Sequence, residues 1–257
     1  MKISKNALYL FTAFLFIITM ACTSTSKLAT TTPILSETAF LQLPSTKPGS
    51  YDTNIKLTNG HPWPILLHIP ATPTTQPRPL ILALHWAGPP ATYQEYASCL
   101  AIPALKHTSA IIVAPSSENV RWWESEGASR IENFIQLAKK YWPIDSTKIL
   151  LTGYSNGGTG SVALAQQLPP GTLSAIIPIA GSYPDLNKLT VPAYFIHGNK
   201  DELFDFESTR YAVDQAMRKN EKIKFITASG KSHYQACSYV SYLRAGIDWV
   251  KKNVWKE

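Results

Sequence analysis

Residues 150–158 read LLTGYSNGG, an apolar run that leads into the pattern Gly-x-Ser-x-Gly centred on Ser155. Short apolar runs are typical of strands buried on both faces of a sheet, and a helical pattern begins directly after the serine. A tight turn from strand to helix forces such a serine into a strained backbone conformation and lifts its Oγ above the sheet. Close packing at that turn favours glycine two residues to either side. The stretch therefore predicts a nucleophilic serine, the alternative being a Gly-rich helix entry without chemistry.

The chain on both sides of this turn alternates between apolar runs and helical patterns. The runs occupy residues 80–84, 110–114, 148–152, 175–179, 193–196 and 223–226. The helical patterns occupy about 91–107, 128–141, 156–168, 206–219 and 236–253. Such alternation after an antiparallel start predicts one α/β domain over residues 50–257, with a mostly parallel sheet and helices on both faces.

The antiparallel start is a predicted hairpin. Residues 55–57 and 65–69 look like strands, and Asn59-Gly60 between them is a strong turn signal. Because proline cannot donate to a strand ladder, Pro62 and Pro64 place the second strand at an edge or delay its start.

Acidic and histidine side chains follow two later strands. Asp201 is the first acid after the run 193–196, and His233 lies between the run 223–226 and the last helix. The working residues of parallel sheets lie in loops at the carboxyl ends of the strands. Ser155, Asp201 and His233 are therefore predicted to meet as nucleophile, acid and base.

Other residues could take these roles. Asp205 and Asp185 are the alternatives for the acid. His197 is the one other histidine after Ser155, and we expect it to pack near the site rather than to act as the base.

Four motifs carry a family resemblance: LHWAG at 84–88, Ile144-Asp145, GYSNGG at 153–158 and HGNKD at 197–201. With them, the chain from about Pro79 onward resembles the secreted polyhydroxybutyrate depolymerase and feruloyl esterase-like branch of the α/β-hydrolases. Phospholipase/carboxylesterase and dienelactone hydrolase-like proteins share most of these motifs, although the latter have Cys in place of Ser155. The resemblance implies the α/β-hydrolase fold with the order Ser, acid, His. The stretch 181–192 is too short for a cap domain, so an open cleft is expected.

The resemblance also implies an oxyanion hole, which is a pair of backbone N–H groups that stabilises the charged intermediate of ester hydrolysis. By position the donors are Ala87 and Asn156, the residue after the serine. Trp86 stands where the superfamily usually has Gly, and His85 is expected to brace this loop.

Substrate contacts are predicted from three tryptophans in loops after strands. Trp86, Trp122 and Trp123 could line an acyl or aromatic groove, although Trp122 and Trp123 could equally cover the sheet edge. The leading hypothesis is a carboxylic-ester hydrolase that acts through an acyl-enzyme on a small or polymeric ester. A serine peptidase or amidase, and a non-catalytic ligand-binding lipoprotein, are the alternatives.

The amino terminus predicts export. Lys2 and Lys5 precede an apolar run that ends at Ala21, as in a secretory signal peptide over residues 1–21. Ala21-Cys22 resembles the lipobox of bacterial lipoproteins, whose Cys is lipidated, although Thr19 replaces the usual Leu. Residues 22–49 are rich in Thr, Ser and Pro and read as a flexible tether. We therefore expect a cell-envelope lipoprotein held at a membrane by its lipid, or a secreted protein if cleavage is of the ordinary kind.

The cysteines and the charged residues indicate a disulfide and exclude some classes of partner. Cys99 and Cys237 remain as a disulfide candidate in an oxidising compartment, which would brace the loop carrying His233. The formal net charge is +7, but the basic residues are scattered, so no nucleic-acid partner is expected. No Cys/His cluster of the metal-binding kind occurs, and we expect no cofactor, no metal and a monomer.

Overall fold

The computed structural model describes residues 32–72 and 75–257. The predicted signal peptide, residues 1–21, and the predicted lipidation site, Cys22, lie outside these residues. Among the helices of the described part, none has the length and apolarity that a membrane span requires.

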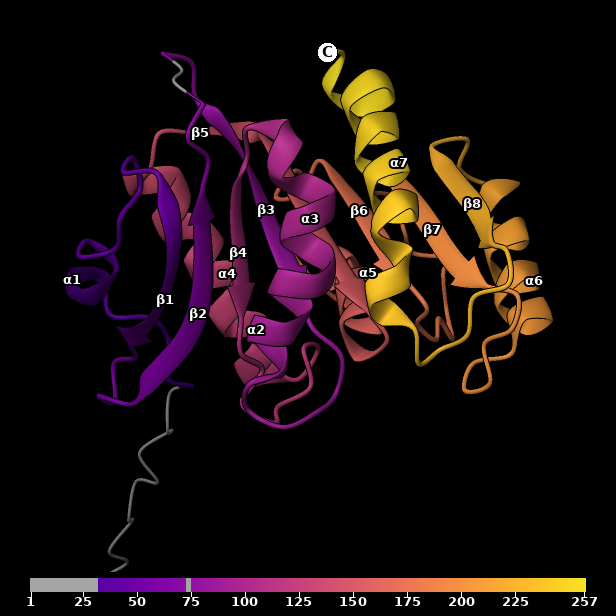
Figure 1. The fold of residues 1–257 in the computed structure, drawn as a ribbon, viewed down its shortest axis with the longest axis horizontal. Helices are drawn as coiled ribbons and strands as arrows, with labels where there is room; N and C mark the ends of the chain where they lie inside the picture. Colours follow the sequence, from indigo (N-terminus) through magenta and orange to yellow (C-terminus); the bar gives the residue numbers. More distant parts are fainter. Residues whose placement is uncertain (1–31, 73–74) are drawn as a thin grey trace, which may run out of the picture. The chain divides into compact units, whose positions relative to one another are not determined.

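One eight-stranded sheet forms the centre of the domain, in the order β1-β2-β4-β3-β5-β6-β7-β8 (Figure 1). The strands are β1 (Gly49–Lys56), β2 (Pro62–Ile69), β3 (Arg78–Leu84), β4 (Ile111–Pro115), β5 (Ile144–Tyr154), β6 (Ala175–Ile179), β7 (Ala193–Gly198) and β8 (Ile223–Ala228). Strand β2 pairs antiparallel with β1 and β4, and all other neighbours are parallel. The predicted mostly parallel α/β sheet is confirmed, and its central strands are apolar throughout because both faces are covered.

Strand β2 differs from one of the two expectations for it. It lies between β1 and β4, so it is not an edge strand. Its ladder with β4 begins only at Ile65, after Pro62 and Pro64. The two prolines are therefore accommodated by a late start on that side.

Helices cover both faces of the sheet (Figure 1). Helices α2 (Thr92–Tyr96), α3 (Ile102–Leu105) and α7 (Val240–Val250) pack on one face, and α4 (Ser125–Tyr141), α5 (Asn156–Gln167) and α6 (Phe206–Met217) pack on the other. Strand β6 is followed by β7 with no helix between them in residues 180–192. The carboxyl edge of the parallel strands thus carries no inserted cap there.

The segment before β1 corrects the predicted tether. Residues 34–36 extend the sheet beside Leu57, and the short helix α1 (Glu37–Phe40) follows. Phe40 is fully buried and stacks on Trp142. The tether prediction is therefore wrong for this part of 22–49, because its apolar side chains complete the core instead of remaining in solvent.

A disulfide joins two helical turns on the same face of the sheet. Cys99 lies in the π-helical turn Ala97–Ala101 between α2 and α3, and Cys237 lies in the 3₁₀ turn Ala236–Tyr239 before α7. These are the two cysteines that the sequence singled out. The bond ties the turn after His233 to the helix that follows the loop of Trp86.

Candidate active site

Ser155 sits on a sharp turn between β5 and α5. Its φ is +54° and its ψ is −114°, a conformation that L-residues rarely adopt. The turn closes tightly, because a Cβ on Gly153 would collide with the Gly157 carbonyl and one on Gly157 with the Leu84 carbonyl. The Ser155 N–H donates to the Ile179 carbonyl at 2.9 Å, which fixes the turn against β6. The two glycines and the strained serine have the geometry expected of a nucleophile turn.

A chain of hydrogen bonds connects Ser155 to Asp201 through His233. His233 Nε2 lies 2.9 Å from Ser155 Oγ, and His233 Nδ1 lies 2.9 Å from Asp201 Oδ2. Because an ionised carboxylate only accepts, Nδ1–H donates to Asp201 and Nε2 is left to accept the serine proton. All three residues lie in loops at the carboxyl ends of β5, β7 and β8.

The Asp201 carboxylate is buried, but hydrogen-bond donors of the protein surround it. Its Oδ1 accepts the backbone N–H groups of Leu203 at 2.9 Å and Phe204 at 2.8 Å. Burial raises the pKa of this carboxyl, but the bonds from His233 and from these N–H groups outweigh burial and hold the pKa below its ordinary value. Asp201 is therefore ionised at neutral pH.

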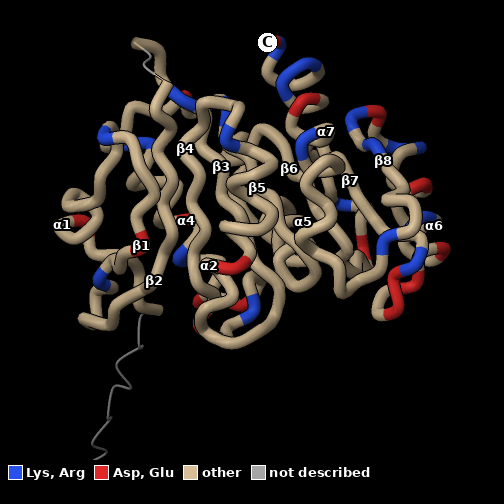
Figure 2. The backbone as a smooth tube through the Cα atoms, in the orientation of Figure 1, with Lys and Arg blue, Asp and Glu red and all other residues tan. Residues whose placement is uncertain are grey.

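The alternatives for the acid are engaged elsewhere. Asp205 caps α6, with its Oδ1 2.8 Å from the Ser208 N–H, and Asp185 accepts the Asn187 N–H at 2.8 Å. Figure 2 shows acidic residues gathered in the loop before α6. One of them, Glu202, has its Oε2 2.9 Å from the backbone N–H of His233.

His197 lies beneath the site, as expected. It is fully buried, its Nε2–H donates to the Phe204 carbonyl at 2.9 Å, and Nε2 lies 3.5 Å from Asp201 Oδ2. Burial lowers the pKa of His197. A neutral His197 thus supports the loop of Asp201 and has no contact with Ser155.

Tyr154 supports the histidine from the other side. Its hydroxyl donates to the His233 carbonyl at 2.8 Å, and its ring lies 5.7 Å from the His233 ring. Sequence reasoning missed this role, because the residue before the serine is variable in the motif and only the fold brings it under His233.

His85 braces the loop expected to stabilise the oxyanion. Its Nδ1 lies 2.5 Å from the Trp86 carbonyl, and its Nε2 lies 2.9 Å from the Ser117 N–H. These partners fix the neutral tautomer, in which Nδ1–H donates and Nε2 accepts. Burial lowers the pKa of His85 to about 4. The indole N–H of Trp122 donates to the His85 carbonyl at 3.1 Å and so also holds this loop.

The two expected oxyanion donors both lie next to Ser155. Ala87 lines the cleft beside Ser155, and Asn156 is the first residue of α5. Across the described residues, no hydrogen bond uses the backbone N–H of either one. Both N–H groups are therefore available to a ligand atom near Ser155 Oγ.

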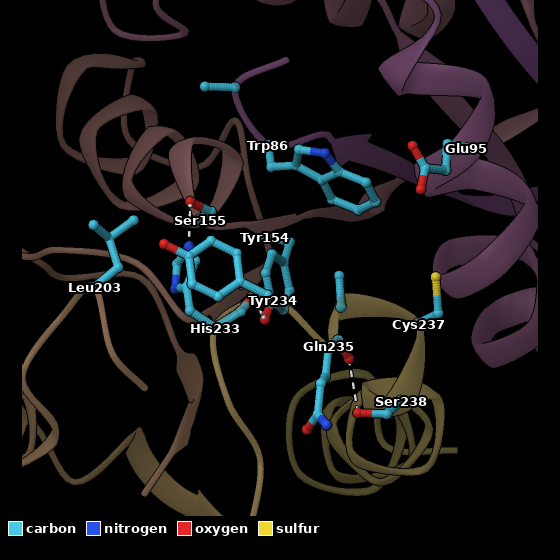
Figure 3. Close-up of a pocket in the computed structure, with 12 residues that line it drawn as sticks. Trp86, Glu95, Tyr154, Ser155, Leu203, His233, Tyr234, Gln235, Cys237 and Ser238 are labelled. Carbon is cyan, nitrogen blue, oxygen red and sulfur yellow. Dashed lines mark hydrogen bonds between the residues drawn. The ribbon is translucent and has the colours of Figure 1, made fainter. Parts of the chain in front are cut away.

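A cleft of about 640 Å³ opens from Ser155 and His233 (Figure 3). Trp86 and Tyr154 form an aromatic wall, with ring centroids 6.0 Å apart, and Tyr234 and Leu203 stand exposed at its mouth. The cleft wall is mostly apolar, which suits an ester with an uncharged body.

Two of the three tryptophans predicted to bind substrate do not line this cleft. Trp122 is buried beneath His85, so the prediction is wrong for it. Trp123 packs on the opposite helical layer, with the Arg121 guanidinium 5.8 Å from its ring. Of the three tryptophans, Trp86 alone lines the cleft. In residues 32–72 and 75–257, no group of His, Cys, Asp and Glu is arranged to hold a metal ion.

Comparison with known proteins gives the family. Residues 107–257, more than half of the chain, match the family model described as PETase, PET hydrolase-like. The chain belongs to the PET hydrolase-like family. No curated protein sequence is significantly similar to it. The α/β serine hydrolase part of the resemblance drawn from the motifs holds for this family member, whereas the comparisons do not point to the polyhydroxybutyrate depolymerase and feruloyl esterase-like branch.

Solved structures show the fold of this PET hydrolase-like protein. A thermostable esterase is 17% identical with a TM-score of 0.63, over 79% of this chain and 62% of its own, so our chain spans less than two thirds of that protein. An S-formylglutathione hydrolase from Staphylococcus aureus is 13% identical with a TM-score of 0.64, over 80% of this chain and 98% of its own. A lidless serine hydrolase from Xanthomonas campestris is 16% identical with a TM-score of 0.61, over 80% and 97%. The protein therefore has the α/β-hydrolase fold.

Proposed function

We propose that this protein is a serine hydrolase that cleaves carboxylic esters through an acyl-enzyme. Ser155 is the nucleophile, His233 the general base and then acid, and Asp201 the carboxylate that orients it. The observation that carries the proposal is the hydrogen-bonded chain from Ser155 Oγ through His233 to Asp201, which ends at the mouth of the apolar cleft. Family membership supports the same reaction class.

In the proposed reaction, His233 carries out each proton transfer. His233 Nε2 accepts the proton of Ser155 Oγ while the oxygen attacks the ester carbonyl, and the backbone N–H groups of Ala87 and Asn156 stabilise the resulting oxyanion. The imidazolium then returns the proton to the leaving alcohol, and an acyl-enzyme remains. A water molecule repeats the sequence and releases the acid. Asp201 stays ionised throughout and holds the charged His233 in place, in agreement with its lowered pKa.

The cleft and the family membership support a proposal for the substrate class. An uncapped cleft with an aromatic wall admits an elongated, uncharged ester whose ends project into solvent. Soluble short-chain esters and polyesters that contain aromatic rings are therefore the substrates to test first.

The test is hydrolysis of p-nitrophenyl butyrate by the full-length chain in mild detergent, beside Ser155→Ala and Ser182→Ala, a matched control at an exposed serine. We expect Ser155→Ala to lose at least a thousandfold in kcat and to lose fluorophosphonate labelling, while Ser182→Ala retains both. Equal activity in the wild type and Ser155→Ala would refute the assignment. Cleavage of the matched p-nitroanilide in preference to the ester would favour an amidase.

We also propose export with lipidation at Cys22, on the sequence pattern of residues 1–26 alone. The test is incorporation of an alkyne-labelled fatty acid during expression in a bacterial host. Cys22→Ala should abolish the label and release the protein from membranes. An unlabelled wild-type protein recovered from the medium would indicate ordinary signal-peptide cleavage instead.

A further inference from the structure

The cleft carries a single carboxylate that the proposed reaction does not use. Glu95 of α2 is the one acidic residue among those that line it, and no lysine or arginine lines it. In the described part of the chain, the Glu95 carboxylate forms neither an ion pair nor a side-chain hydrogen bond. It is thus a free negative charge at the wall of the cavity that contains Ser155.

Glu95 stands at the far end of the cleft from the reacting atoms. In Figure 3 its carboxylate lies beside α2, and the Trp86 ring lies between it and Ser155 and Leu203. A substrate that places its ester at Ser155 and lies along Trp86 therefore brings its distal end toward this carboxylate.

The charges around Glu95 reinforce its effect. Glu95 also borders a hollow on the other side of α2 that contains Asp52, whose carboxylate is held by the Tyr93 hydroxyl at 2.8 Å and by the Gln94 amide. Figure 2 shows acidic residues in the loop before α6, and Glu95 itself is the one acid of α2. Asp52 thus adds a second carboxylate to the surroundings of Glu95, and no described lysine or arginine lines the cleft.

We propose that Glu95 determines the charge specificity of the cleft. It favours esters whose distal group is cationic or donates hydrogen bonds, and it disfavours esters that carry a carboxylate there. This inference rests on the proposed esterase function and deepens it. On a polyester, Glu95 directs cleavage to uncharged segments and away from fragments that already end in an acid near α2.

The expected size of the effect follows from Coulomb's law. Two unit charges 4 Å apart interact by about 1 kcal/mol in water, which is about fivefold in kcat/KM, and by more in a partly shielded cleft. Since salt shortens the Debye length from about 10 Å at 0.1 M to about 3 Å at 1 M, the discrimination should weaken as salt is added.

The experiment compares esters that differ only in distal charge, on either side of the scissile bond. The acyl series is p-nitrophenyl pentanoate, mono-p-nitrophenyl glutarate and the p-nitrophenyl ester of 5-(trimethylammonio)pentanoate. The alcohol series is phenyl acetate with a neutral, carboxylate or trimethylammonio group at the para position. The kcat/KM of each charged ester is divided by that of the neutral ester for the wild type, Glu95→Gln and Glu221→Gln. Glu221 precedes β8 at the opposite edge of the sheet and provides a matched loss of charge.

In at least one series, Glu95→Gln should raise the ratio for the anionic ester and lower that for the cationic ester, each about fivefold. The shifts should shrink at 1 M salt, and Glu221→Gln should keep the wild-type ratios. Ratios unchanged by Glu95→Gln in both series, or shifted equally by Glu221→Gln, would overturn the inference while leaving the esterase proposal intact. Failure of the wild type to cleave even the neutral esters would overturn the proposed function, and this inference with it.

Discussion

The backbone N–H of His233 lies 2.9 Å from Oε2 of Glu202, the residue next to Asp201. Two consecutive acids therefore hold one histidine at two points, Asp201 at the ring and Glu202 at the main chain. The loop after β7 thus fixes both the rotation of the imidazole and the position of its backbone.

The first prediction concerns this second point of attachment. Glu202→Ala should lower kcat about tenfold with little change in KM, because a lost hydrogen bond to a charged group costs about 1–3 kcal/mol and frees the loop of His233. Glu202→Gln keeps an acceptor and should recover most of the rate. Glu207→Ala, an exposed acid on α6 paired with Arg210, is the control. Identical kinetics for Glu202→Ala and Glu202→Gln would contradict a positioning role through this bond.

The second prediction concerns the disulfide. Cys99 and Cys237 are separated by 138 residues, so their bond restricts a long loop of the unfolded chain. Its removal in Cys99→Ser should lower the free energy of unfolding by about 3–5 kcal/mol. It should also lower kcat, because Cys237 lines the cleft four residues after His233. Denaturant unfolding and steady-state kinetics measure the two effects.

The double variant separates the bond from the side chains. Cys99→Ser, Cys237→Ser and the double variant should have the same stability, which the wild type should approach on reduction. Rapid alkylation of both thiols in native, unreduced protein would show that the bond is absent.

The third prediction is a pH dependence caused by His85. Its pKa is lowered from about 6.5 to about 4, so between these values the unfolded chain binds a proton that the folded protein does not. Stability must therefore fall as the pH falls through this window, by about 3 kcal/mol from His85 alone. In His85→Gln the decline from pH 7 to pH 4 should be shallower by that amount, although the variant is less stable at pH 7. Parallel curves of unfolding free energy against pH would show that His85 is not buried in its neutral form.

Much of the fold and the central residues of the site could be read from the sequence, because they depend on local patterns. Apolar runs locate buried strands, and the Gly-x-Ser-x-Gly turn requires its glycines for contacts within a few residues. The order of Ser155, Asp201 and His233 after three strands was enough to predict that they meet, since parallel strands end at one edge.

Residues whose roles depend on distant contacts were not predictable in this way. Tyr154 and Glu202 bind the backbone of His233 across 79 and 31 residues of chain, and Glu95 lines the cleft although it precedes Ser155 by 60 residues. No spacing rule relates these residues to His233 or to the cleft. The prediction that Trp122 contacts substrate was wrong, because a tryptophan in a loop after a strand can face either the cleft or the core. The indole N–H of Trp122 donates to the buried His85 carbonyl. This bond holds the Trp122 ring under the loop of His85 and not in the cleft.

The fourth prediction concerns the segment around α1, which the Thr/Ser/Pro composition had indicated as a tether. Phe40 is fully buried between Phe134 and Trp142, with ring centroids 5.3 and 5.1 Å away, so it is part of the core that supports α4. Phe40→Ala should cost about 3–5 kcal/mol in the free energy of unfolding, as large-to-small substitutions in cores do. The neighbouring Leu41 is 53% exposed, and Leu41→Ala should change stability by less than about 0.5 kcal/mol.

A chain shortened to begin at residue 50 should behave like Phe40→Ala or worse. It loses Phe40 together with the bonds of Ser36 and Thr58 that extend the sheet beside β1. Thermal unfolding of the shortened chain beside one that begins at residue 32 measures the difference. Equal melting temperatures would mean that this segment adds nothing to the core, and that the Thr/Ser/Pro composition had correctly marked it as a tether.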